Sequence, residues 1–282
     1  MATPTMIYNG KKVADDASSL LHNNRGFLMG DGFFESMRCR KGKILFEEDH
    51  WTRLWNSCAL LELNMDTLPD KAALRNQIQD LIEINGFGDD VRVRLSVFRH
   101  SEGFYTPGEN NAGYLLNIKS LPSFYGSVGD GLKGGIFTKQ AKARGPYSNI
   151  KSLSSQLYVM AALYSRNNGF DESLILNTAG NFIEGTSTNL FLVYKDQLLT
   201  PPLSEGCVNG VFRKILIDLA RNNNVPVVER FITASEITNA TEIILSNVIN
   251  GIKWIKTLEE KEYTHQMASY LGDCLVKELS QH

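Results

Sequence analysis

The sequence predicts a mixed α/β (α+β) protein built from two domains. Its 282 residues are many for one hydrophobic core and a natural length for two. Strand-like and helix-like apolar patterns alternate along the chain. A stretch rich in glycine, serine and proline, 122–135, interrupts them and predicts an interdomain linker. The predicted domains are therefore 1–121, an N-terminal α/β domain, and 136–282, a C-terminal α/β domain.

The predicted N-terminal domain combines strands with two amphipathic helices. A hairpin is expected over 6–13, because Asn9-Gly10 suits a two-residue turn. Residues 33–49 predict two strands joined at Lys41-Gly42. Apolar residues at helical spacing predict helices over 50–63 and 70–88. Alternating apolar residues predict strands over 90–100 and 112–121.

The predicted C-terminal domain shows the same mixture of patterns. Three helices are expected, over 152–169, 210–224 and 264–279. Three strands are expected, over 172–177, 189–194 and 241–248.

Composition favours an ordinary globular protein of the cytoplasm. The net charge of -2 gives no basic field for nucleic acid. No apolar run approaches the ~20 residues that span a membrane, and the first residues lack a signal-peptide pattern. The four cysteines and five histidines are scattered, so neither a disulfide framework nor a metal site is expected.

The strongest motif runs from Glu184 to Arg213. It reads "EGTSTNLF", then "LLT", then "VNGVFR". About a dozen positions are constrained at correlated spacings, so the motif is far more specific than a lone glycine pattern. It resembles the signature of the class IV aminotransferases, the fold-type IV enzymes that use pyridoxal 5'-phosphate (PLP). "RGFLMGDGFFESMR", "HWTRL" and "NIKSL" resemble further motifs of that family, so the resemblance covers nearly the whole chain.

The resemblance implies roles for a lysine and an acid. PLP enzymes need a lysine amine that reacts with the cofactor aldehyde, and Lys151 of "NIKSL" matches it. Lys139 and Lys142 are fallback candidates that we expect to face solvent. The cofactor ring nitrogen needs an acidic partner to stay protonated, and Glu184 stands at that place. Taken alone, Glu184 would be interpreted as a solvated loop residue.

The cofactor phosphate needs donors and a positive charge. A glycine before a helix supplies main-chain N–H groups, and the resemblance implies those of Val211 and Phe212. Arg53 of "HWTRL" matches the family arginine that pairs with the phosphate, although it could instead be a helix-surface residue. The loop from Ser246 to Ile252 adds Asn247 and Val248 as candidate cofactor contacts.

Two positions depart from the branched-chain aminotransferases of the family. Those enzymes usually have threonine at Val248 and tyrosine at Gln156, and each hydroxyl would contact the cofactor. "SNVINGI" and "CVNGVFR" are more similar to aminodeoxychorismate lyases of the same family.

The substrate side is less defined by the sequence. Candidate lining residues are aromatic, although core packing is the more frequent use of such side chains: Phe27, Phe33, Phe34, Tyr105 and Tyr147. Candidate partners of a substrate carboxylate are Arg38, Arg99 and Arg144.

The resemblance thus implies a two-domain enzyme similar to D-amino acid aminotransferases, and a homodimer. We expect transfer of an amino group between a small amino acid and a 2-oxo acid, because that chemistry is the commoner one in the family. The alternative is an aminodeoxychorismate lyase that releases pyruvate and 4-aminobenzoate. A non-catalytic PLP-binding protein is a more remote alternative, disfavoured by the presence of both Lys151 and Glu184.

Overall fold

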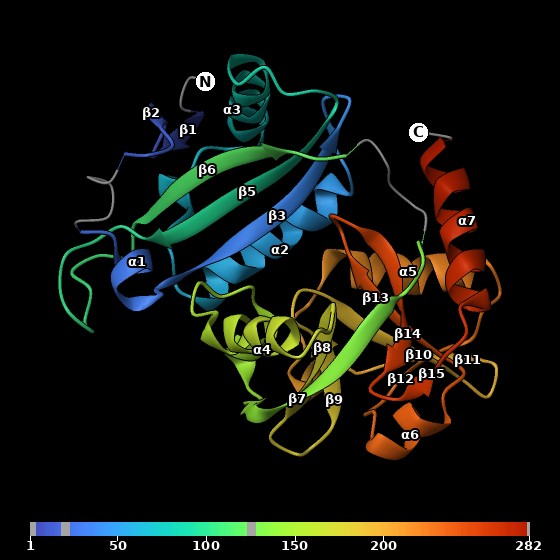
Figure 1. Ribbon diagram of the computed structural model, residues 1–282. Coiled ribbons are helices and arrows are strands. Elements are labelled where there is room, and N and C mark those ends of the chain that lie inside the picture. Colours follow the sequence, from blue (N-terminus) through green and yellow to red (C-terminus); the bar gives the residue numbers. More distant parts are fainter. Residues whose placement is uncertain (1–3, 18–22, 123–127, 281–282) are drawn as a thin grey trace. The chain divides into compact units, whose positions relative to one another are not determined.

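The chain forms two compact units (Figure 1). A computed structural model describes residues 4–17, 23–122 and 128–280. Unit 1 comprises Met1–Ser123 and Ile150–Ser154, and unit 2 comprises Phe124–Asn149 and Ser155–His282. Both units mix helices and strands, which confirms the predicted fold class. The five residues around Lys151 therefore belong to unit 1, although the chain on both sides of them belongs to unit 2.

Unit 1 contains an antiparallel sheet with the strand order β2-β1-β6-β5-β3-β4. Its strands are β1 Thr5–Tyr8, β2 Lys11–Ala14, β3 Gly32–Arg40, β4 Lys43–Ile44, β5 Asp90–Arg99 and β6 Ala112–Ser120. Asn9 and Gly10 have φ angles of 45° and 80°, which confirms the hairpin turn expected there.

Two helices cover one face of the unit 1 sheet. The helical elements are α1 Arg25–Met29, α2 Glu47–Leu60, the short 3₁₀ turn η2 Met65–Thr67, and α3 Lys71–Ile84. Met37 and Val93 of the sheet share a buried core with Leu54 of α2 and Leu81 of α3. Each such side chain contributes roughly 1.5–3 kcal/mol on burial. Side chains on the opposite face of the sheet, such as Phe34 and Arg94, do not belong to this core.

Helix α2 begins earlier than the sequence predicted. The expected second strand of 33–49 is limited to Lys43–Ile44, and α2 starts at Glu47. Phe46 has a φ of 54°, which ends the extended backbone. Glu47, Glu48 and Asp49 then occupy the first helical turn, where acidic side chains interact favourably with the helix dipole.

Unit 2 contains a sheet that closes on itself. Its strands are β7 Leu132–Lys142, β8 Glu172–Asn177, β9 Phe182–Gly185, β10 Asn189–Tyr194, β11 Gln197–Thr200, β12 Val227–Glu229, β13 Glu242–Asn247, β14 Gly251–Leu258 and β15 Lys261–Glu262. The order β10-β13-β14-β7-β8-β9 returns to its start, because β9 also pairs with β10. The closing pair is Asn189 with Glu184, so Glu184 is fixed by the closure of a barrel-like sheet.

Helices pack around the unit 2 sheet (Figure 1). They are α4 Gln156–Asn167, α5 Val211–Asn222, α6 Ala234–Asn239 and α7 Gln266–Ser280, with the 3₁₀ turns η3 Pro146–Asn149 and η4 Leu203–Glu205. Helix α5 packs on β13, α7 packs on β13 and β14, and α4 packs on β7 and β8. The helix expected from Ser152 starts at Gln156, because the residues before it pair with β3.

The predicted linker, 122–135, overlaps strand β7. Residues 123–127 lie outside the described residues, and β7 begins at Leu132. The prediction treated Gly134 and Gly135 as loop residues. In β7 they allow close packing, since a Cβ at Gly135 would overlap the ring of Phe170. The boundaries at 121 and 136 stay a prediction for separately folding domains.

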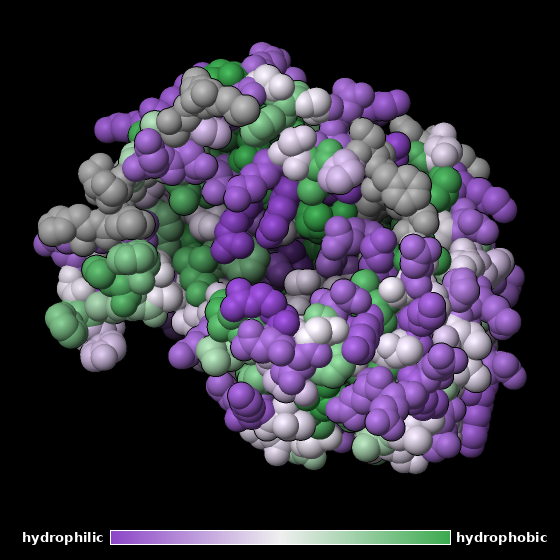
Figure 2. Space-filling model, in the orientation of Figure 1, coloured by the Kyte–Doolittle hydropathy of each residue, from purple (hydrophilic) through white to green (hydrophobic). Residues whose placement is uncertain are grey.

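Hydrophilic side chains cover much of the face shown in Figure 2, with exposed apolar residues in small groups. Within the described part of the chain, no helix is both long enough and apolar enough to cross a membrane.

Candidate active site

Lys151 lies on an extended segment that pairs with the start of β3. Phe34 N donates to Lys151 O at 2.8 Å, and Leu153 N donates to Gly32 O at 3.0 Å. A Cβ at Gly32 would overlap Val97 O, so glycine is needed where this segment crosses the sheet. Lys151 Nζ lies 4.7 Å from the centre of the Phe34 ring. The main chain thus fixes Lys151 on the face of the sheet opposite the α2–α3 core.

Two arginines share this face with Lys151. Arg94 lies opposite Ser36 of β3, and Arg92 lies two residues before it on β5. Arg94 Cζ stacks 3.8 Å from the centre of the same Phe34 ring. Because both cations lie near the same ring, the distance between Lys151 Nζ and Arg94 Cζ is at most the sum of their distances to the ring centre. Burial, and then the charge of Arg92, lower the pKa of Arg94.

Neither arginine forms an ion pair with a carboxylate in the part of the chain that the structure describes. Arg92 Nη2 donates to Ser36 Oγ at 3.4 Å, and Arg94 Nε donates to Ser96 Oγ at 3.3 Å. Arg92 Nε is buried and has no hydrogen-bond partner among the described residues. The sequence prediction missed both arginines, although their alternation in "VRVRLS" indicated a shared face.

Arg53 is buried under the sheet and is not a helix-surface residue. Its guanidinium donates twice to Glu35, from Nε at 2.7 Å and from Nη2 at 2.6 Å. His50 Nδ1 lies 2.9 Å from the same carboxylate. Burial alone would raise the pKa of Glu35, but Arg53 and His50 hold it at about 2. The pairing of Arg53 with a cofactor phosphate stays a prediction.

The arginines predicted to bind a substrate carboxylate have protein partners. Arg38 is buried against Asp90, with Nη2 and Oδ1 2.8 Å apart. Arg99 Nε lies 3.2 Å from Asp31 Oδ2 and its Nη1 donates to Asn110. Arg144 pairs with Glu205 at 3.3 Å and is half exposed. Arg38 and Arg99 thus pair with protein carboxylates, and their contact with a substrate stays a prediction.

The predicted aromatic residues are placed differently from one another. Phe33 points into the α2–α3 core and is fully buried, so it does not line a substrate site. Phe34, its neighbour, lies beside Lys151 because side chains alternate along a strand. Phe27, Tyr105 and Tyr147 are exposed.

Glu184 is a buried strand residue and not a loop residue. It lies in β9 with 2% exposure. Its Oε1 accepts from Tyr158 OH at 2.8 Å and from Lys142 Nζ at 2.7 Å. Its Oε2 accepts from Val208 N at 2.8 Å. Burial and the Glu184 charge raise the pKa of Tyr158, so its phenol keeps the proton that it donates.

Lys142 is the main correction to the predicted site residues. We expected it to face solvent, like the exposed Lys139, yet its side chain is only 11% exposed. The sequence alternates apolar and polar residues too weakly here to predict strand β7 or the direction of its last side chain.

The first turn of α5 has the features expected of an anion site. Gly210 is the N-cap, and no side chain caps the helix. Val211 and Phe212, the predicted phosphate donors, are its first two residues. A Cβ at Gly210 would overlap Asn189 Oδ1, so glycine is needed here for close approach to β10.

The turn after β13 holds the two remaining candidates. Asn247 Oδ1 accepts from Ile249 N at 3.0 Å and Asn250 N at 2.8 Å, and its Nδ2 donates to Ser187 O at 3.3 Å. Asn247 thereby fixes the turn. Val248 is buried and offers no hydroxyl group. Their contact with a cofactor stays a prediction.

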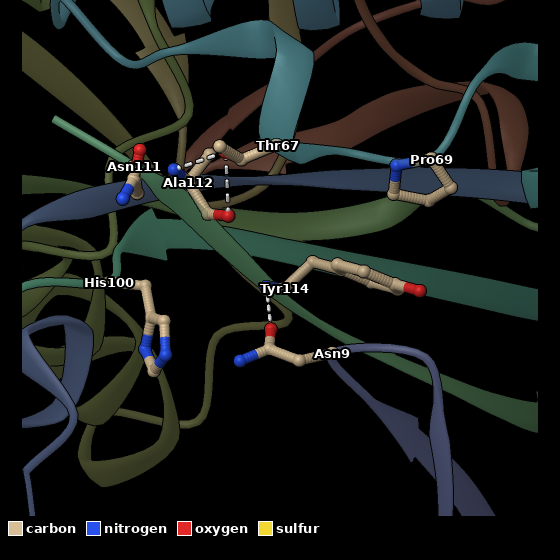
Figure 3. Close-up of a pocket in the computed structure, with 7 residues that line it drawn as sticks. All are labelled: Asn9, Thr67, Pro69, His100, Asn111, Ala112 and Tyr114. Carbon is tan, nitrogen blue, oxygen red and sulfur yellow. Dashed lines mark hydrogen bonds between the residues drawn. The ribbon is translucent and has the colours of Figure 1, made fainter.

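A pocket of about 380 Å³ lies in unit 1, and none of the predicted site residues is among those that line it (Figure 3). Its lining contains no Asp, Glu, Lys or Arg and comprises Asn9, Thr67, Pro69, His100, Asn111, Ala112 and Tyr114. Figure 3 shows Asn9 Oδ1 accepting from Tyr114 N and Thr67 bonded to the main chain of Ala112, so these side chains fix the start of β6. No group of three or more metal-ligating side chains occurs in residues 4–17, 23–122 and 128–280.

Comparison with known proteins identifies the family. The model of the family described as amino-transferase class IV matches residues 32–257. The chain belongs to this family. A class IV aminotransferase is an enzyme, and the expected enzyme class is thereby confirmed.

Two relatives carry aminotransferase names. Branched-chain-amino-acid aminotransferase-like protein 2 of Arabidopsis thaliana is 30% identical over 76% of this chain, which spans only 38% of that longer protein. D-alanine aminotransferase of Staphylococcus aureus is 25% identical over 85% of this chain and 83% of its own length.

Two solved structures share the fold. The 4-amino-4-deoxychorismate lyase of Pseudomonas aeruginosa superposes with a TM-score of 0.83 and 26% identity, covering 97% of this chain and 99% of that one. A hypothetical aminotransferase of Mycobacterium tuberculosis in a PLP-bound form gives a TM-score of 0.81 and 20% identity, covering 97% and 99% of the two chains. The aminotransferase fold of type IV is thus confirmed, and the lyase is an established member of the same structural group.

Proposed function

We propose that this class IV aminotransferase uses PLP to transfer an amino group between a small amino acid and a 2-oxo acid. The placement of Lys151 carries the proposal. Its amine lies beside the Phe34 ring, with Arg94 on the same ring and Arg92 further along the same sheet face, where a small anionic substrate finds both a nucleophile and carboxylate-binding groups.

Residues of unit 2 suit two parts of the cofactor, its phosphate and its ring nitrogen. The uncapped first turn of α5, at Val211 and Phe212, suits its phosphate. The buried carboxylate of Glu184 suits its ring nitrogen, because an acid there favours the protonated ring. When bound, PLP supplies an electron sink for the charge that develops at the substrate α-carbon.

The chain's own groups would then do three things. The Lys151 amine would hold the cofactor aldehyde and would move the proton at the substrate α-carbon. Phe34 covers one side of that amine with an aromatic ring. Arg92 and Arg94 bind a substrate carboxylate through their planar forks.

Labelling of the bound cofactor tests this assignment. Borohydride reduction of the yellow protein should fix PLP on the peptide that contains Lys151. A label on Lys139 or Lys142 would overturn it, and Lys142 is the sharper rival because it is buried. Lys151→Ala should abolish the label while leaving the fold intact.

Aminodeoxychorismate lyase is the second candidate. The Pseudomonas aeruginosa lyase is 26% identical over nearly the whole chain, and Val248 and Gln156 lack the hydroxyls of branched-chain enzymes. A transaminase leaves the amino group on its cofactor, so an amino acid alone should bleach the yellow colour. If no amino acid does so, and aminodeoxychorismate yields pyruvate and aminobenzoate without an acceptor, the lyase function replaces ours.

We further infer that the enzyme acts as a cytoplasmic homodimer. Phe104 and Tyr105 are 78% and 86% exposed on a loop that is nevertheless held in place. Arg25 Nη1 donates to Gly103 O at 2.7 Å and to Phe104 O, which keeps the two rings presented together. Ordered, exposed aromatic residues favour association. Light scattering should give twice the chain mass, and Phe104→Ser with Tyr105→Ser should lower it.

A further inference from the structure

Lys142 and Glu184 form a buried ion pair that the proposed function does not use. Lys142 Nζ lies 2.7 Å from Glu184 Oε1, and both side chains are nearly or fully buried. Tyr158 OH donates to the same oxygen, and Val208 N donates to the other. The carboxylate is therefore held in one orientation by three donors.

Lys142 is itself fixed by the end of β7. Its carbonyl oxygen accepts from Thr178 N at 3.1 Å, and its residue pairs with Asn177 of β8. Its ammonium lies 5.3 Å from the centre of the Tyr158 ring, within the range of a cation–π contact. The lysine and the phenol thus approach Glu184 together as one rigid group.

The charges in this cluster balance without any bound molecule. Lys142 gives the Glu184 carboxylate a cationic partner at 2.7 Å. A buried carboxylate without such a partner would be strongly destabilising. A carboxylate has about four lone-pair directions, and three are occupied here, so Oε2 can accept one further donor.

We propose that Lys142 is a positioning residue that stays paired with Glu184 when the cofactor is bound and weakens the hold of Glu184 on the ring-nitrogen proton. The inference rests on the proposed function, in which Glu184 faces that nitrogen. A carboxylate shared between two cations attracts each less strongly than it would attract one alone. Without Lys142, the ring nitrogen should therefore keep its proton to higher pH.

The first test compares three variants without cofactor. Lys142→Met removes the charge, Lys142→Arg keeps it, and Lys139→Met removes an exposed lysine of the same strand. Thermal unfolding of the cofactor-free proteins should show a clear loss of stability for Lys142→Met only. Added PLP should then raise the melting temperature of Lys142→Met more than that of the parent, because the ring cation replaces the missing partner. If PLP raises the melting temperatures of Lys142→Met and the parent equally, Lys142 has only a packing role and the inference is wrong.

The second test observes the ring nitrogen itself. PLP labelled with ¹⁵N in the ring is bound to each protein, and its chemical shift is followed against pH. The midpoint for Lys142→Met should lie at least about one pH unit above that for Lys139→Met. Should Lys142→Met not fold, Lys142→Gln gives the same comparison, since it donates a hydrogen bond without a charge.

The outcomes separate this inference from the proposed function. If PLP is fixed on Lys151 but the two midpoints agree, Lys142 has no influence on the ring and only this inference is wrong. If borohydride fixes PLP on Lys142, or the parent binds no PLP, the proposed function is wrong and the inference falls with it.

Discussion

Arg53 and Glu35 are joined by two hydrogen bonds of 2.7 and 2.6 Å beneath the unit 1 sheet. The pair links α2 to β3, and His50 contacts the same carboxylate. Two donors aligned on two oxygens are the strongest arrangement open to these side chains. Whatever else Arg53 binds, it is required to neutralise Glu35.

Replacing Arg53 should therefore destabilise the cofactor-free protein. Arg53→Ala leaves the Glu35 carboxylate buried without its cation, which costs about 3–5 kcal/mol of unfolding free energy. Arg53→Lys keeps the charge but cannot form the two parallel hydrogen bonds to Glu35. Its unfolding free energy should therefore fall by less than that of Arg53→Ala. Urea unfolding without PLP measures both. A value for Arg53→Ala within about 1 kcal/mol of the parent would contradict the pairing.

Stability should fall in acid partly because of Glu35. Its folded pKa of about 2 lies below the ordinary value of 4.5, so the ionised form is favoured by folding. The resulting stability is present above pH 4.5 and is lost as the pH falls toward 2. The shift corresponds to roughly 3 kcal/mol. Glu35→Gln should flatten this part of the pH profile, and an unchanged slope in that variant would refute the assignment.

Glu184→Gln tests the role of the acid at the cofactor ring. The amide keeps the shape and can still accept from Val208 N, so PLP should stay bound. Turnover should drop roughly a hundredfold, or about 2.7 kcal/mol, because the ring loses the charge that keeps it protonated. Absorbance of the bound cofactor provides the control. Full turnover in this variant would show that Glu184 is only structural.

Arg94→Gln should weaken substrate binding. Loss of a charged donor to a carboxylate should raise KM for the amino acid roughly 10- to 100-fold. Arg75→Gln is the matched control, since Arg75 pairs with Glu47 on the helical side of unit 1 and is half exposed. Steady-state kinetics on both variants decides the matter. If the two KM values change alike, Arg94 does not contact substrate.

The sequence predicted most of the elements that carry a clear period. The hairpin at Asn9-Gly10 and the amphipathic helices α3, α5 and α7 were found because their patterns are local. The family motif also singled out Glu184 and Lys151, because its spacing is specific. Both are placed in or beside strands of the structure.

The sequence could not predict partners that lie far apart along the chain. Arg94 became a candidate only when β5 placed it beside Phe34, whose neighbour in space is Lys151, and Arg92 became one because it lies on the same face of β5. Lys142 was expected to face solvent, because nothing in the nearby sequence indicates that the last side chain of β7 contacts Glu184 of β9. Short strands such as β9 were missed for the same reason, since closure of the sheet defines them.

Residues Ile150–Ser154 belong to unit 1 although the chain on both sides of them belongs to unit 2, and this affects the order in which the nascent chain can fold. Phe34 N has its hydrogen-bond partner in Lys151 O, more than a hundred residues later. As the chain emerges from the ribosome, unit 1 cannot finish its last pairing until Ser154 is outside the exit tunnel, well after the start of unit 2 has appeared. A nascent chain arrested with residue 123 just outside the tunnel should then be more sensitive to protease near Gly32 than one arrested with Ser154 just outside it.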